Sequence, residues 1–137
     1  MTTLHASAVG IAGKGLLILG PSGAGKSALA LALMALGARL VADDRVILWA
    51  DGGRLWADCP PAIRGRIEAR GLGILRAEPA GLVPVAQAVD LGRAEPERLP
   101  PFRTTMLLGV ALPLVLGPMG PHLPSALMQL MRGGRCD

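Results

Sequence analysis

Aromatic residues are scarce in this chain of 137 residues, which contains two Trp, one Phe and no Tyr. Nucleic-acid binding is therefore a weak hypothesis: the net charge of +4 suits phosphate ligands or an acidic partner, but almost no side chain can stack on a base. Cysteine is equally rare. Cys59 and Cys136 have neither zinc-site spacing nor a disulfide framework, so we expect a reducing compartment, the cytoplasm.

Long hydrophobic runs are also lacking. Residues 106–116 are apolar, but Gly109 and Pro113 interrupt a run that is already too short to span a bilayer. The first residues show no basic segment followed by an apolar stretch, so we expect neither a secretory signal nor a membrane partner. With 51% hydrophobic and 18% charged residues, the composition is that of a globular protein, and the length predicts one domain over residues 1–137.

What the sequence does contain is a phosphate-binding motif. Residues 20–27, GPSGAGKS, match the pattern G-x-x-x-x-G-K-[ST]. An apolar run at residues 16–19 predicts a buried strand before the motif. The Ala- and Leu-rich residues 28–36 predict a helix after it, with Gly37 as its C-terminal cap. This order of strand, loop and helix is the context that the motif requires.

The residue types of the motif suit the oxygens of a triphosphate. Glycines let successive backbone N–H groups approach phosphate oxygens, and the N-terminus of the helix adds partial positive charge there. Lys26 can reach the β- and γ-phosphates, and the Ser27 hydroxyl can coordinate Mg²⁺. We therefore expect a nucleotide with a triphosphate and Mg²⁺ as ligands, with the nucleotide bound by Gly20, Pro21, Ser22, Gly23, Ala24, Gly25, Lys26 and Ser27.

Two adjacent carboxylates follow the next expected strand. Residues 40–42 form a short apolar run that ends in Asp43 and Asp44, and Asp43 lies sixteen positions after Ser27. Carboxylates at a strand end beside a phosphate loop hold Mg²⁺ or accept a proton in nucleotide enzymes. The alternative is an Asp-Asp turn before the next strand. We favour the functional interpretation, with one carboxylate near the metal and the other near a histidine as proton acceptor, but the pattern does not assign these roles.

Three further residues are candidates. His5 lies in residues 2–11, whose alternation predicts a strand in a hairpin with the strand before the phosphate loop; alone, such a histidine is more often structural than catalytic. Glu68 and Arg70 lie in the basic, glycine-rich residues 63–75. This segment fits two interpretations equally well: a surface loop ahead of a strand, or a functional segment with Glu68 on Mg²⁺ and Arg70 on a phosphate.

The rest of the chain completes an α/β pattern. An Asp-Gly turn near residue 52 predicts a hairpin of strands at residues 46–49 and 54–57. Later elements are expected as a strand at residues 83–89, a Pro-rich loop at 93–102, strands within 107–116 and a closing helix at 123–131. The Leu and Met stripe of that helix predicts a core face or an oligomer contact.

The motifs together resemble one family. His5, GPSGAGKS, LVADD ending at Asp44, and EARGLGIL beginning at Glu68 are similar in order and spacing to the catalytic domain of HPr kinase/phosphorylase. The resemblance covers residues 3–75, and the LPPF and ALPLVLG stretches look like those of short, single-domain proteobacterial members. The resemblance implies an α/β phosphate-loop kinase domain with a mixed β-sheet and flanking helices, similar to the nucleotide-binding core of phosphoenolpyruvate carboxykinases.

The resemblance also implies an activity, the transfer of phosphate from ATP to a serine of HPr, the phosphocarrier of the sugar phosphotransferase system. Family members also remove this phosphate by phosphorolysis, with inorganic phosphate attacking and pyrophosphate leaving. This chain has no recognisable copy of the basic Pro-Val-Arg-Pro-Gly-Arg-like loop that long members use in phosphorolysis, so kinase activity is the first expectation. The family forms hexamers, which leaves a homo-oligomer open. The implied catalytic residues are His5, Lys26, Asp43, Asp44 and Arg70, with Ser27 and Glu68 on Mg²⁺.

Two other functions fit the residues. A nucleotide-sensing regulatory module would bind ATP without efficient phosphotransfer. A small-molecule kinase or an ATPase would use the same phosphate loop with a different acceptor. The identity of the labelled product after incubation with ATP separates the three functions.

Overall fold

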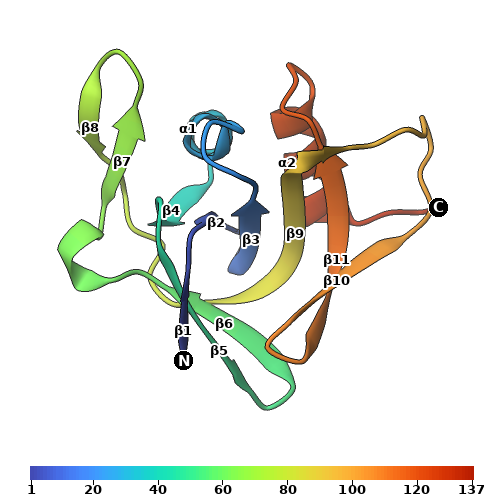
Figure 1. The fold of residues 1–137 in the computed structure, drawn as a ribbon, viewed down its shortest axis with the longest axis horizontal. Coiled ribbons are helices and arrows are strands. Elements are labelled where there is room, and N and C mark those ends of the chain that lie inside the picture. Colours follow the sequence, from blue (N-terminus) through green and yellow to red (C-terminus); the bar gives the residue numbers. More distant parts are fainter.

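Two α-helices and eleven β-strands form the protein in the computed structural model, which describes residues 1–137 (Figure 1). The helices are α1 (Lys26–Ala35) and α2 (Leu123–Gly133), and a short 3₁₀ helix, η1, covers Pro61–Ile63. The strands are β1 (Thr2–Leu4), β2 (Ser7–Ile11), β3 (Lys14–Leu19), β4 (Arg39–Ala42), β5 (Val46–Asp51), β6 (Arg54–Asp58), β7 (Arg66–Ala69), β8 (Gly73–Arg76), β9 (Val83–Ala94), β10 (Arg103–Leu107) and β11 (Val110–Gly117).

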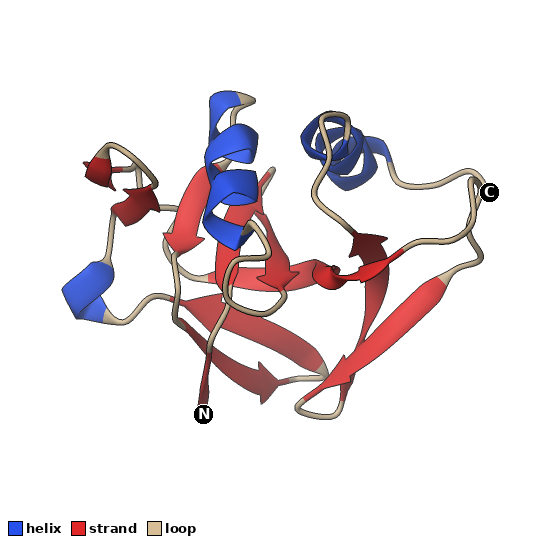
Figure 2. Ribbon diagram, turned by 45° about the horizontal axis from the view of Figure 1, so that its top comes forward, coloured by secondary structure: helices blue, strands red, loops and turns tan.

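Nine strands join in one curled, mixed sheet, while β7 and β8 form a separate hairpin. The order along the sheet is β1-β5-β6-β9-β3-β2-β4, and β11 also pairs with β9 and carries β10 beyond it. Strand β9 runs parallel to β3 and to β11, whereas all other neighbours are antiparallel. Both helices lie on the same side of the sheet (Figure 2). The expected mixed α/β fold is confirmed, with both helices covering one face.

The side chains of β3 fill two separate cores. Leu16 and Ile18 pack with residues of α1 and α2, whereas Leu17 belongs to the core inside the curl of the sheet. Successive residues of a strand point to opposite faces, so a strand covered on both sides must be apolar throughout. This explains the uninterrupted apolar run at residues 16–19, and it fixes the end of β3, where the phosphate loop begins, between two packed layers.

Helix α1 confirms the expected helix, with shifted ends. It begins at Lys26 and ends at Ala35, where residues 28–36 were expected. Gly37 has a φ of 111°, its N–H donates to the Met34 carbonyl at 3.1 Å, and the Ala38 N–H donates to the Leu33 carbonyl at 3.0 Å. These two bonds end a helix at a left-handed glycine and turn the chain at once into β4. Neither helix has the length and apolar character needed to cross a membrane.

The expectation of one strand over residues 2–11 is wrong. Strand β1 pairs with β5, whereas β2 pairs with β3 and β4, so the expected hairpin with the phosphate-loop strand is confirmed for β2 alone. His5 and Ala6 form a bend between the two strands. At this bend the chain leaves β1, at the edge of the sheet beside β5, and enters β2, which lies between β3 and β4. A single unbroken strand cannot make this change of position. His5 consequently lies at the bend rather than on the strand.

The segment at residues 63–75 is also more regular than a loop. It contains the end of η1 and most of the hairpin β7–β8, whose pairing runs from Arg66 opposite Arg76 to Ala69 opposite Gly73. Ile67 is buried against the core that contains α1, and this contact fixes the hairpin.

Three boundaries in the second half differ from the expected ones. Strand β9 continues to Ala94 instead of ending near Val89, because β11 pairs along its later residues. The loop between β9 and β10 therefore covers only residues 95–102. Strand β10 begins at Arg103, earlier than expected, and α2 extends to Gly133. The hairpin β5–β6 is confirmed, with its turn at Gly52 and Gly53.

Candidate active site

A cleft of about 630 Å³ lies at the carboxyl end of the strand that leads into the phosphate loop. Because β2 is antiparallel to both β3 and β4, the carboxyl ends of β3 and β4 meet at one edge of the sheet. Ligands of α/β sheets bind at such edges. The cleft is lined from four segments: the β1–β2 bend, the phosphate loop with the start of α1, the end of β4, and the hairpin β7–β8. The sequence-predicted residues among its lining are His5, Ser22, Gly23, Gly25, Lys26, Ser27, Asp44, Glu68 and Arg70.

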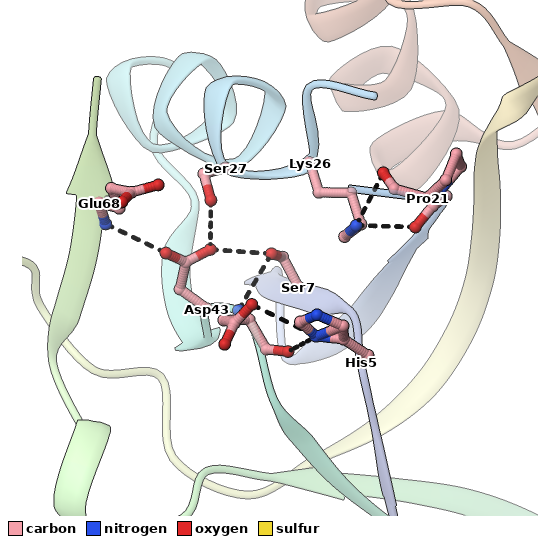
Figure 3. A network of polar contacts seen from close by, with 9 residues as sticks. His5, Ser7, Pro21, Lys26, Ser27, Asp43 and Glu68 are labelled. Carbon is pink, nitrogen blue, oxygen red and sulfur yellow. Dashed lines mark hydrogen bonds and ion pairs between the residues drawn. The ribbon is translucent and has the colours of Figure 1, made fainter. Parts of the chain in front are cut away.

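Asp43 is held by three hydrogen-bond donors and is only 7% exposed. Its Oδ1 accepts from the Ser27 hydroxyl at 2.7 Å and from the Ser7 hydroxyl at 2.9 Å. Its Oδ2 accepts from the backbone N–H of Glu68 at 3.0 Å (Figure 3). The carboxylate thus ties together the start of α1, strand β2 and strand β7. A carboxylate with most of its acceptor positions occupied in this way suits a holding role better than proton abstraction.

Asp44 differs from its neighbour in exposure and orientation. Its side chain is 63% exposed, lines the cleft and lies beside His5, with Oδ1 and His5 Nδ1 separated by 3.3 Å. His5 Nδ1 also lies 2.8 Å from the Asp44 backbone carbonyl oxygen. The φ of Asp44 is 72°, a left-handed conformation that Asp tolerates better than most residues. This twist at the end of β4 turns the two adjacent carboxylates into different surroundings.

Ser7 lines the same cleft but is not among the residues predicted from the sequence. It is 1% exposed, its hydroxyl donates to Asp43 Oδ1, and the same oxygen accepts from the backbone N–H of Asp44 at 3.4 Å. One hydroxyl therefore contacts both members of the acidic pair. The available signal was weak: a single small polar residue in an otherwise apolar strand, two positions after the candidate histidine.

Lys26 is the first residue of α1 and lies folded over its own loop. Its amine donates to the Gly20 carbonyl at 2.7 Å and to the Pro21 carbonyl at 3.1 Å (Figure 3). Gly20, Gly23 and Gly25 all have positive φ values, of 147°, 83° and 100°, which L-residues with side chains rarely adopt. These backbone angles wrap the loop around the end of the helix, where phosphates bind in such motifs.

The donor set around Ser27 fits Mg²⁺. Hard cations bind oxygen, and Mg²⁺ uses one or two protein carboxylates together with substrate phosphates and water. Here the Ser27 hydroxyl lies against Asp43, and Glu68, whose backbone is tied to Asp43, lines the same cleft. No group of three or more His, Cys, Asp or Glu side chains converges as a metal site by itself. Arg70 follows β7 and lines the cleft from the hairpin side.

Fold and site together define a class of mixed α/β proteins in which a glycine-rich loop, oxygen donors and an exposed carboxylate surround one cleft. Residues 1–82 match the family model described as HPr Serine kinase C-terminal domain, and the chain belongs to this family. The predicted resemblance is thereby confirmed.

Individual relatives agree with this membership. The HPr kinase/phosphorylase of Streptococcus thermophilus is 48% identical over 75 residues, which cover 54% of this chain and 24% of that protein. The HPr kinase/phosphorylase of Caldanaerobacter subterraneus is 43% identical over 93 residues, or 65% of this chain and 30% of that protein. The chain thus spans about a quarter of the length of most of the curated relatives it matches.

A solved structure matches nearly the whole chain. The Hpr(Ser) kinase/phosphatase from Coxiella burnetii superposes with a TM-score of 0.82 at 31% identity, covering 96% of this chain and 95% of that one. The second half of the chain, which lies beyond the family-model match, therefore also has a counterpart of the same fold.

Proposed function

We propose that this protein is a cytoplasmic, ATP-dependent kinase that phosphorylates a serine of an HPr-like phosphocarrier protein. The observation that carries the proposal is the division between Asp43 and Asp44. One carboxylate is buried and fixed by Ser7, Ser27 and the Glu68 backbone; the other is free beside His5 in the same cleft. A phosphoryl-transfer site needs both a fixed oxygen cluster and a free proton acceptor.

In the proposed reaction the phosphate loop and Lys26 hold the triphosphate of ATP. The Lys26 amine would exchange its present partners, the Gly20 and Pro21 carbonyls, for phosphate oxygens, which as anions are stronger acceptors. Mg²⁺, when bound, would supply positive charge to the phosphoryl oxygens. The residues that would hold it are Ser27 and Glu68, with Asp43 behind them.

Asp44 is the proposed base. Its carboxylate takes the proton of the acceptor serine hydroxyl as that oxygen forms a bond to the γ-phosphorus and the bond from phosphorus to the β-phosphate oxygen breaks. The products are phosphoserine and ADP, and the proton resides on Asp44 before it passes to solvent. His5, 3.3 Å from Asp44 Oδ1, orients the carboxylate. In phosphorolysis the protonated Asp44 would return its proton to the departing serine oxygen, with inorganic phosphate as attacking group and pyrophosphate as product.

The test is incubation of the purified chain with γ-labelled ATP, Mg²⁺ and purified HPr, followed by mapping of the labelled residue. Label on one HPr serine is the expected result. Tight nucleotide binding with no labelled product would instead support a nucleotide-sensing module. Label in a small molecule or in free phosphate would support a small-molecule kinase or an ATPase. Incubation of phosphorylated HPr with inorganic phosphate, with detection of pyrophosphate, tests the reverse activity separately.

A further inference from the structure

The hairpin β7–β8 stands beside α1, apart from the main sheet (Figure 1). Its two faces differ. In an antiparallel pair, directly opposed residues share a face, so Arg66, Arg76, Glu68 and Ile74 lie on one face and Ile67, Ala69 and Leu75 on the other. Ile67 and Ala69 are 1% and 6% exposed and pack toward the body of the protein. The face with the arginines, here called the outer face, is exposed.

The charge on this hairpin is concentrated and unpaired. Residues 66–76 contain three arginines and one acidic residue, so they carry two of the four net positive charges of the chain. Arg66 and Arg76 lie directly opposite each other, and neither forms an ion pair or a side-chain hydrogen bond. Like charges directly opposite on a sheet are destabilising. An acidic group of a partner would relieve this repulsion.

Apolar side chains accompany the arginines. Ile74 on the outer face is 65% exposed, and Leu72 at the turn is 80% exposed. Free phosphate or nucleotide needs the positive charge alone, whereas a protein surface with acidic and apolar residues satisfies both features.

The outer face also leads to the proposed base. A second hollow, of about 370 Å³, is lined by Arg66 and Ile74 and shares Ser27, Asp44 and Glu68 with the main cleft. A side chain that enters along this face therefore arrives at Asp44 without crossing the phosphate loop.

We propose that the outer face of β7–β8, through Arg66, Arg76 and Ile74, docks an acidic and apolar surface of the phosphoacceptor protein and directs its serine to Asp44. This inference rests on the proposed kinase function and assigns to the hairpin the selection of the acceptor. Arg66, Arg76 and Ile74 then act in binding of the protein substrate, whereas Glu68 of the same hairpin keeps its proposed place beside the Mg²⁺ of MgATP.

The experiment compares the wild type with Arg66→Ser/Arg76→Ser and with Ile74→Thr. The matched control is Arg54→Ser/Arg98→Ser, which removes the same charge from exposed positions outside both hollows.

Three quantities are measured for each protein: the Kd for purified HPr by calorimetry, the Kd for MgATP, and the KM for HPr in the transfer assay. We expect the Kd and the KM for HPr to rise about tenfold or more in the double variant, while its Kd for MgATP stays at the wild-type value. The control variant should keep the wild-type values of all three quantities. Raising NaCl from about 0.05 M to about 0.5 M should weaken HPr binding to the wild type more than to the double variant.

Loss of folding is a separate and measurable outcome. Because the double variant removes a repulsive cross-strand pair, its thermal midpoint should equal or exceed that of the wild type. A lower midpoint would show that the arginines stabilise the hairpin and would contradict the docking role.

The remaining outcomes also decide the question. Unchanged HPr affinity in the variants would overturn the docking proposal and leave the kinase proposal intact. A parallel loss of MgATP affinity would overturn it in favour of a nucleotide site, and a change in self-association alone would overturn it in favour of a contact between copies of this chain. Wild-type binding of HPr without transfer would refute the kinase but keep the docking test valid. If the wild type neither binds nor phosphorylates HPr, both proposals fall.

Discussion

Asp43 and Asp44 are adjacent in sequence, yet their surroundings are opposite. Asp43 lies under the helix start with three donors on its oxygens, and Asp44 lies in the cleft with only His5 beside it. The cause is local: Asp44 has a φ of 72°, so the two side chains do not follow the alternation of an extended strand. The buried carboxylate joins three segments of the site, and the exposed one is the base in the reaction proposed above.

This difference predicts different defects for the two amide substitutions. Asp44→Asn should lower kcat for transfer to HPr by about 10²- to 10⁴-fold, because an amide cannot accept the serine proton, while the Kd for MgATP stays unchanged. Asp43→Asn should chiefly lower the stability of the fold. The amide NH₂ would face a group that donates to the carboxylate in the wild type, either the Glu68 N–H or a serine hydroxyl, and two donors cannot bond to each other. Rapid-quench kinetics and thermal unfolding measure the two effects. Equal rates for Asp44→Asn and the wild type would remove Asp44 as the base.

Ser7 carries a second prediction. Ser7→Ala should destabilise the protein by about 0.5–1.5 kcal/mol, because the buried Asp43 carboxylate loses one donor and the part-buried Asp44 N–H loses its acceptor. The rate should fall as well, since Asp44 is positioned through this hydroxyl. Ser7→Cys, which keeps the shape and weakens the donor, serves as the matched variant in urea unfolding and transfer assays. A Ser7→Cys protein with wild-type behaviour would show that shape, not the hydrogen bond, matters.

Among the elements, those with local signals could be predicted from the sequence and those set by distant partners could not. The β3–loop–α1 unit, the β5–β6 hairpin and α2 carry their own apolar spacing, turn residues and end signals. The break at His5 and the extension of β9 to Ala94 depend on which strands lie beside them.

The same limit applies to the candidate site. The motif residues His5, Lys26, Asp44, Glu68 and Arg70 were predicted and do line one cleft. Their proposed roles remain predictions. The contact between Asp43 and the Glu68 backbone joins residues twenty-five positions apart, and Ser7 and Asp43 are thirty-six apart. Such contacts depend on the packing of β7 beside β4 and of β2 beside β4, which no local pattern encodes.

The loop between β9 and β10 is closed by an ion pair whose strength depends on pH. Arg103 donates to both carboxylate oxygens of Glu95, each at 2.8 Å. This hydrogen bonding lowers the pKa of Glu95 below its ordinary value of 4.5. A lowered pKa in the folded state adds stability above the unfolded-state pKa, and that stability disappears as the pH falls through the folded-state value.

Arg103→Gln should therefore be less stable than the wild type at neutral pH, and the difference should shrink as the pH drops below about 4.5, the ordinary pKa of a glutamate. Urea midpoints measured between about pH 3 and pH 7 test this, with Arg54→Gln as an exposed control that lacks an acidic partner. A stability difference that stays constant across this range would assign the effect of Arg103 to packing rather than to the ion pair.

At the scale of the whole molecule, the chain spans about a quarter of the length of most of its curated relatives but matches 95% of the solved Coxiella burnetii chain. The curled sheet brings the bend after β1, the ends of β3 and β4, and the hairpin β7–β8 to one edge. Two cores, one on each side of β3, hold these segments in place. Each segment that lines the cleft is thus fixed to residues of this chain, which predicts that nucleotide binding requires no further part of a longer protein.

Nucleotide binding by this chain can be tested from its thermal stability alone, without any phosphoacceptor protein. A ligand that binds only the folded state at about one hundred times its Kd stabilises it by about 2.7 kcal/mol, which corresponds to a rise of about 10 °C in Tm for a chain of this size. MgATP should produce this rise in the wild type and in Asp44→Asn, since that carboxylate contacts no residue of the phosphate loop. Lys26→Ala should abolish most of this rise, because the amine at the start of α1 is the only lysine of the cleft.

An equal rise of the Tm in Lys26→Ala would place the nucleotide elsewhere on the protein. No rise in the wild type would mean that the cleft has no useful affinity for ATP, and the kinase proposal would then fail before any acceptor is considered.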